Sequence, residues 1–147
     1  MKFFMLKISI ILFFITSFAG NAHAVNPEAE EKGLLFLNIS WEEALQKAQT
    51  ENKLIFVDFY ASWCGRCKRL KENTFPDPEA GMLFNEMFIN LAFDIEKADG
   101  KALAEQYNVR RHPTLLFVNG QGEVVEQATG FHNARKLIEL GQSAITE

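Results

Sequence analysis

The sequence predicts an α/β fold in which a central mixed β-sheet has helices on both faces. Residues 54–60 form an apolar run without alternation, which is typical of a strand covered on both sides. Helical and strand patterns alternate along most of the chain, as in domains whose helices pack against a mainly parallel sheet. The turn residues 119–122 lie between two strand-like runs and predict a tight hairpin, so the last two strands should be antiparallel.

Length and composition fit one globular domain. The chain has 147 residues, of which 48% are hydrophobic and 23% charged. Its formal net charge is −4 with no basic run, which argues against nucleic acid as a partner. Two cysteines cannot form a disulfide scaffold that replaces a core, so we expect them to carry the chemistry of the protein. We also expect the protein to be a monomer.

The first 24 residues have the pattern of a secretory signal peptide. Lys2 and Lys7 supply positive charge, residues 8–18 are apolar, and Ala22 and Ala24 flank a small residue–x–small residue cleavage site. The alternative is an uncleaved membrane anchor, but the apolar stretch is shorter than the ~20 residues that span a bilayer. We therefore expect cleavage after Ala24 and a periplasmic or secreted protein.

The polar residues 25–33 predict a flexible lead-in, and the folded domain is expected over residues 34–147. The domain should begin with a short strand over residues 34–39. A capping box at Ser40 then predicts a helix to about Glu51, followed by the buried strand over residues 54–60.

From Cys64 onward the sequence predicts three strands and three helices, the first of which is interrupted by prolines. A helix should begin at Cys64, end near Asn73 and, after a break at two prolines, resume over residues 79–87. The remaining elements are strands over residues 88–94, 114–118 and 123–128, with helices over residues 99–107 and 133–145.

Cys64 and Cys67 are the candidate reactive residues. They follow the carboxyl end of the buried strand, where open α/β sheets place their sites. At a helix N-terminus the Cys64 thiolate is stabilised by free N–H groups and the helix dipole, so Cys64 is the expected nucleophile. Cys67 lies one turn deeper on the same helix face, near enough to form a disulfide with Cys64 and to act as the resolving thiol.

Two other interpretations of the cysteine pair remain open. A zinc site would need further soft ligands, and the remaining candidates, His112 and His132, lack ligand-type spacing, so no metal is expected. A purely structural disulfide across three residues would close a very short loop and constrain little.

The segment Val57-Asp58-Phe59-Tyr60-Ala61-Ser62-Trp63-Cys64-Gly65-Arg66-Cys67-Lys68 resembles the active-site segment of the thioredoxin superfamily. Residues 112–117 resemble its cis-proline segment, Asn119-Gly120 its hairpin, and Gly130-Phe131 the glycine before its last helix. Residues 74–79 resemble the secreted branch that includes the C-terminal domain of the bacterial transmembrane thiol-reductant conduits. The resemblance covers residues 40–145 and implies a thioredoxin fold.

Further site residues follow from this resemblance and from the pattern. A carboxylate inside an apolar strand should have a raised pKa, and the resemblance implies that Asp58 accepts the proton of Cys67 through water; pairing with a lysine is the alternative. The resemblance also implies a cis bond before Pro113, where a substrate strand could pair. His112 would then lie beside the thiolate, and Trp63 would border the substrate groove.

Two positions differ from common thioredoxins and are expected to tune the redox potential. Arg66 follows Gly65 where those proteins carry proline, and His112 stands where they carry an aliphatic residue. Both would stabilise the reduced thiolate, which makes the disulfide more oxidising.

The sequence thus predicts an exported thiol:disulfide oxidoreductase that acts as a protein-disulfide reductase and serves redox homeostasis. No cofactor is expected, because no glycine-rich nucleotide loop is present. Electrons would come from another protein, which could be membrane-bound, and the substrates would be proteins with disulfides. The alternatives are a disulfide oxidase or isomerase, and a non-catalytic thioredoxin-fold binding module.

Overall fold

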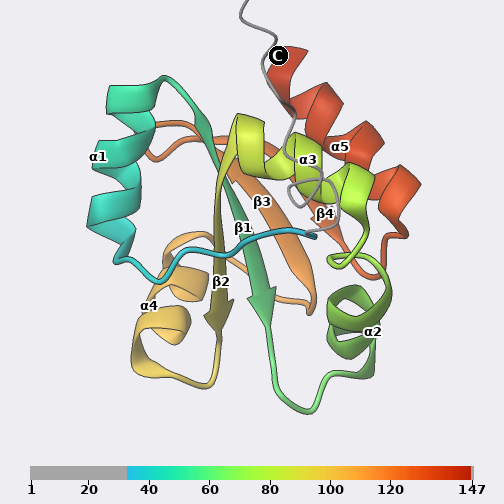
Figure 1. The fold of residues 1–147 in the computed structure, drawn as a ribbon. Coiled ribbons are helices and arrows are strands. Elements are labelled where there is room, and N and C mark those ends of the chain that lie inside the picture. The colour runs from blue at the N-terminus through green and yellow to red at the C-terminus, as the bar shows by residue number, and fades with distance from the viewer. Residues whose placement is uncertain (1–32, 147) are drawn as a thin grey trace, which may run out of the picture.

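The computed structural model describes residues 33–146, in which four strands form one mixed sheet (Figure 1). The strand order is β2-β1-β3-β4. β1 (Leu54–Tyr60) pairs in parallel with β2 (Phe88–Asp94) and antiparallel with β3 (Thr114–Val118). β3 pairs antiparallel with β4 (Val124–Thr129), which confirms the predicted hairpin.

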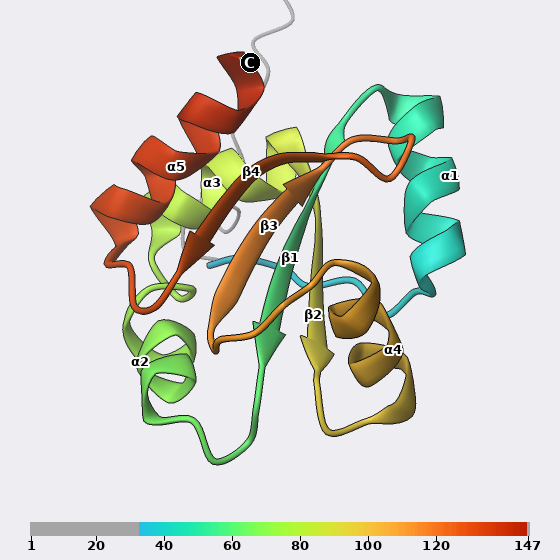
Figure 2. The ribbon, with the colours of Figure 1, turned by 180° about the vertical axis from the view of Figure 1, so that it is seen from behind.

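Helices cover both faces of the sheet, as the sequence predicts (Figures 1 and 2). α1 and α4 pack on one face, and α2, α3 and α5 lie on the other, which agrees with the two main clusters of buried side chains. The bounds of the helices are α1 Trp41–Glu51, α2 Gly65–Asn73, α3 Pro78–Met87, α4 Ala98–Gln106 and α5 Ala134–Thr146.

The buried strand β1 sends successive side chains to opposite faces of the sheet. Val57 and its odd-numbered neighbours join the cluster under α1 and α4. Phe56 joins the cluster of aromatic and aliphatic side chains under α3 and α5. Asp58 shares the face of Phe56, so its carboxyl group lies on the side of the sheet where α2 also packs.

Caps and prolines set the helix boundaries. Ser40 caps α1 in a complete capping box with Glu43. The predicted break between the second and third helices is confirmed, because α2 ends at Asn73 and α3 begins at Pro78. Asp77 caps α3 by accepting a hydrogen bond from the backbone N–H of Ala80.

The predicted strand over residues 34–39 is wrong: this segment has no strand pairing and runs as an extended connection. It makes isolated backbone hydrogen bonds, from Leu34 N–H to the Phe75 carbonyl (2.7 Å) and from Leu37 N–H to the Asn90 carbonyl (2.8 Å). The segment crosses from the cluster under α3 to the cluster under α1 and therefore leaves the edge of β2 after one bond.

The predicted signal peptide and most of the predicted lead-in lie outside the described residues. Within residues 33–146, no helix is both long and apolar enough to cross a membrane.

Candidate active site around Cys64 and Cys67

The two cysteines lie where β1 leaves the sheet and α2 begins. Residues 61–63 form a short connection, and the Cys64 N–H donates to the Ala61 carbonyl at 3.1 Å. Cys64 is the N-cap of α2, and its Sγ accepts a hydrogen bond from the Cys67 N–H at 3.2 Å. The first turn of the helix thus supplies a backbone donor to the sulfur of Cys64, which favours a thiolate there.

Cys64 and Cys67 form a disulfide, with their Cα atoms 5.3 Å apart. Both residues are only 6% exposed. A partner sulfur can reach this disulfide only if the partner makes close contact with the surrounding surface.

Asp58 lies in the middle of β1 and is 4% exposed. Its Oδ1 atom has no hydrogen-bond partner. Burial raises the pKa of this carboxyl from 3.8 to about 7, since an ionised carboxylate without a partner is costly in an apolar environment. Asp58 is therefore poised to gain or lose a proton near neutral pH, as the sequence predicts.

A cavity of about 760 Å³ joins Asp58 and Cys67. Its walls are mostly apolar and come from the segment before α1, the carboxyl ends of β1 and β2, and α2 with the residues that follow it. Lys68 and Lys71 of α2 also line this cavity, but the raised pKa of Asp58 has burial as its cause and no lysine. The alternative interpretation, in which a lysine pairs with Asp58, finds no support in this geometry.

The peptide bond between His112 and Pro113 is cis, as the resemblance implies. This bond precedes β3, which runs antiparallel to β1. Pro113 therefore lies at the same end of the sheet as the carboxyl end of β1. The Pro113 carbonyl accepts a hydrogen bond from the Gly130 N–H at 2.8 Å, which ties this segment to the end of β4.

Trp63 and His112 meet beside the cysteines. Their ring centroids are 6.0 Å apart in an edge-on arrangement. Trp63 is 67% exposed, whereas His112 is half-buried and its Nδ1 is buried without a partner. The exposed indole, supported by a half-buried imidazole, thus forms an aromatic surface next to Cys64.

Three exposed arginines lie close to these residues in the sequence. Arg66 lies between the cysteines, directly after Gly65. A Cβ added at Gly65 would meet nothing within 4 Å. Arg110 and Arg111 are exposed and directly precede His112. Within the described residues, none of these three arginines forms a salt bridge.

Sequence reasoning missed one residue of this site, Glu96, in the turn between β2 and α4. Its carboxylate accepts hydrogen bonds from Ser62 and Trp63 in the segment before Cys64. Glu96 is more than 30 positions from both partners, so no local pattern in the sequence indicates the contact.

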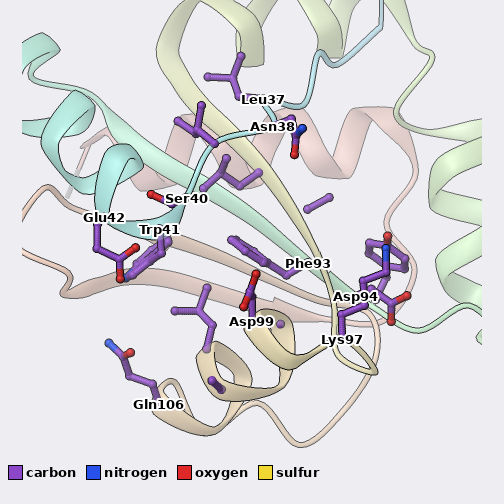
Figure 3. Close-up of a pocket in the computed structure, with 17 residues that line it drawn as sticks. Leu37, Asn38, Ser40, Trp41, Glu42, Phe93, Asp94, Lys97, Asp99 and Gln106 are labelled. Carbon is purple, nitrogen blue, oxygen red and sulfur yellow. The ribbon is translucent and has the colours of Figure 1, made fainter.

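A second cavity, of about 590 Å³, lies on the far side of β2 between α1 and α4 (Figure 3). Trp41 and Glu42 from α1 line one side and Asp99 and Gln106 from α4 the other. Neither cysteine contributes to it. No cluster of three potential metal ligands occurs among residues 33–146.

Comparison with known proteins gives one family and several relatives. Residues 41–145 match the family model described as a thioredoxin-like domain. Curated relatives include the "Thiol:disulfide interchange protein DsbD" of Tatumella citrea, 32% identical over 115 residues, and that of Haemophilus influenzae, 33% identical over 104 residues. The matches cover 75% and 67% of this chain but only 20% and 18% of those proteins, so the chain spans about a fifth of their length.

Solved structures agree with this assignment. A putative disulphide-isomerase from Bacteroides thetaiotaomicron is 41% identical, with a TM-score of 0.67, and the match covers 79% of this chain and 97% of that one. The C-terminal domain of Neisseria meningitidis DsbD in its oxidised form is 26% identical, with a TM-score of 0.61 and coverage of 76% and 98%. The predicted sheet with helices on both faces therefore has the expected family topology.

Proposed function

Because the chain belongs to the family of thioredoxin-like domains, we propose that it is a thiol:disulfide oxidoreductase that reduces disulfide bonds in other proteins. The observation that carries this proposal is the Cys64–Cys67 disulfide at the first turn of α2. The helix N-terminus stabilises a thiolate on Cys64, and the second sulfur is already within bonding reach of the first.

The reaction moves two electrons from the dithiol to the substrate. The Cys64 thiolate attacks one sulfur of a substrate disulfide, which forms a mixed disulfide and releases the first substrate thiolate. Cys67 then loses its proton and attacks the Sγ of Cys64, which forms the Cys64–Cys67 disulfide and releases the second substrate thiolate. A protein dithiol donor reduces the enzyme again, and no cofactor takes part.

Asp58 serves as the base for the second step. Its pKa of about 7 matches a group that accepts a proton near neutral pH. The cavity that joins Asp58 to Cys67 has room for the water through which the proton passes. Asp58→Asn should lower turnover near neutral pH by about 100-fold, while alkylation of reduced Cys64 by iodoacetamide stays fast. Unchanged turnover in the folded variant would remove Asp58 from the mechanism.

The substrate binds as an extended segment beside Pro113. This proposal rests on the position of Pro113 at the same end of the sheet as the carboxyl end of β1, and on the exposed Trp63 with its support from His112. Gly65 leaves space above the first turn of α2 for the substrate sulfur.

Insulin reduction tests the proposal. Wild-type protein with dithiothreitol should accelerate precipitation of the insulin B chain, and Cys64→Ala should abolish the acceleration. Cys67→Ala should retain a mixed disulfide with the substrate, which non-reducing electrophoresis detects. A wild-type protein that does not accelerate insulin reduction would favour the binding-module alternative.

A disulfide isomerase is the second candidate, because the Bacteroides relative with 41% identity is itself named a putative disulphide-isomerase. Arg66 supports it further, since a cation near Cys64 makes the disulfide more oxidising. Recovery of activity from scrambled ribonuclease separates the two functions: an isomerase restores it in a glutathione buffer, whereas a reductase leaves the ribonuclease reduced.

We also propose that the protein acts outside the cytoplasm, after cleavage at Ala24, and receives electrons from a protein dithiol. The relatives named thiol:disulfide interchange proteins support a donor of this chemistry. Capture of partners on Cys67→Ala in cells, followed by mass spectrometry, identifies the proteins that form a mixed disulfide with Cys64.

A further inference from the structure

We propose that Glu96 is a positioning residue, which fixes the indole of Trp63 beside the disulfide and thereby sets the affinity for protein substrates. This inference rests on the proposed function. It adds a residue that lies outside the Cys64–Cys67 motif and acts through Trp63.

Glu96 bridges two loops with one carboxylate. Its Oε2 accepts a hydrogen bond from the Ser62 hydroxyl at 2.9 Å, and its Oε1 accepts one from the Trp63 indole N–H at 3.1 Å. The two oxygens therefore hold two consecutive residues that directly precede Cys64. Both bonds are charge-assisted, which makes them stronger than bonds between neutral groups.

The turn that carries Glu96 is itself held in place. The Glu96 N–H donates to Asp94 Oδ1 at 3.0 Å, and the Ile95 N–H donates to the Tyr60 carbonyl at 3.0 Å. The neighbouring Lys97 N–H donates to the Asp94 carbonyl at 3.0 Å. Figure 3 labels Asp94 and Lys97 on either side of this turn. The carboxylate is thus presented from a fixed backbone, not from a mobile loop tip.

Trp63 needs such an anchor, because it is 67% exposed and has little packing to restrict its rotation. The indole is held at its N–H by Glu96 and at its ring by the edge-on contact with His112. An aromatic side chain that is already ordered before binding loses less conformational entropy when a partner packs against it. Glu96 therefore lowers the cost of forming the enzyme–substrate complex and takes no part in the sulfur chemistry.

The test compares Glu96→Ala with Glu96→Gln. Alanine removes both contacts, whereas glutamine keeps an oxygen for the Trp63 N–H and an NH₂ that can donate to the Ser62 oxygen. Glu105→Ala, at an exposed position on α4, is the matched control. Each variant is assayed with insulin, which must pack against the surface, and with bis(2-hydroxyethyl) disulfide, which is too small to need Trp63.

We expect Glu96→Ala to raise the KM for insulin about three- to tenfold with kcat unchanged. The rate with the small disulfide should stay the same, and Glu96→Gln should restore the wild-type KM. Hydrogen exchange of the Trp63 indole N–H, followed by NMR and assigned with Trp63→Phe, should be faster in Glu96→Ala and normal in Glu96→Gln.

The inference is overturned if Glu96→Ala frees the indole N–H but leaves the KM for insulin unchanged. It is equally overturned if both substrates slow down together, because Glu96 would then act on the cysteines. These outcomes differ from failure of the proposed function, in which the wild-type protein reduces neither substrate. Trp63→Phe provides a second route: if the contact matters, Glu96→Ala should add no further loss in that background.

Discussion

Asp58 is the only charged side chain that is buried among residues 33–146, and this makes it a source of pH-dependent stability. Its folded-state pKa of about 7 lies above the unfolded value of 3.8. The folded state therefore binds a proton more tightly than the unfolded state, and stability falls as the pH rises between these two values.

Asp58→Asn removes this titration. The difference in free energy of unfolding between the variant and the wild type should grow in favour of the variant as the pH rises from about 4 to about 8. The expected growth is roughly 4 kcal/mol, the equivalent of about three pKa units. Urea unfolding of the oxidised proteins over this range measures the gain. Glu105→Gln, at an exposed position, should follow the wild type. A gain that is the same at all pH values would contradict the raised pKa.

Arg66 is expected to influence the redox potential of the Cys64–Cys67 pair. Arg66 belongs to the first turn of α2 and lies between the two cysteines in the sequence, so we expect its charge to stabilise the reduced thiolate. Arg66→Pro should make the couple more reducing, by about 30 mV for each tenfold change in the equilibrium constant. Equilibration against glutathione at low and high salt measures the shift, which salt should diminish because Arg66 is exposed.

Arg66→Gln is the control for this prediction. It removes the charge and keeps the backbone N–H, so it should reproduce the shift if charge is the cause. A potential that is unchanged in both variants would leave His112 as the residue that tunes the couple.

At the scale of elements, α5 packs closely against α3 at a glycine. A Cβ on Gly141 of α5 would lie 2.9 Å from Cζ of Phe84, whose ring is fully buried in the cluster under these helices. The close approach of α5 to α3 therefore depends on the missing side chain.

Gly141→Ala should lower the free energy of unfolding by about 1–2 kcal/mol, because the cost of displacing Phe84 exceeds the gain in helix propensity. Thermal unfolding measures the loss. Ser143→Ala, at an exposed position of the same helix, should have little effect. A stabilised Gly141→Ala variant would show that the ring of Phe84 can move aside freely.

The elements that the sequence predicts well have strong local signals. The unbroken apolar run of β1 and the capping box of α1 each determine their structure within a few residues. The segment over residues 34–39 shows why such signals can mislead. Leu34 is buried and Leu35 exposed, an alternation that a strand would share, but the segment crosses the sheet edge and makes only one backbone-to-backbone hydrogen bond to β2.

The residues of the candidate site also differ in how well the sequence predicts them. Cys64, Cys67 and Asp58 stand within one stretch of sequence whose pattern indicates their chemistry, and the cis bond before Pro113 follows from the resemblance. Glu96 gives no such signal, because an exposed glutamate in a turn looks like any solvated residue. Its importance depends on a contact between distant segments, which only the tertiary structure supplies.

For the whole molecule, the remaining prediction concerns export. We expect the mature protein to begin at Val25, since Ala22 and Ala24 form the small residue–x–small residue pattern directly before the proposed cleavage point. Mass spectrometry of protein isolated from an envelope fraction gives the N-terminus directly. Intact Met1 on membrane-associated protein would support the anchor instead.

The arginines around the disulfide also affect how partners approach. The chain as a whole is acidic, with a net charge of −4. Arg66 is exposed between the cysteines, Arg110 and Arg111 are exposed directly before His112, and the Glu96 carboxylate holds Trp63 on the same surface. Charged side chains of both signs thus lie near the disulfide, and their field acts on a charged molecule during diffusion. We therefore expect the rate at which charged partners meet the disulfide to depend on ionic strength.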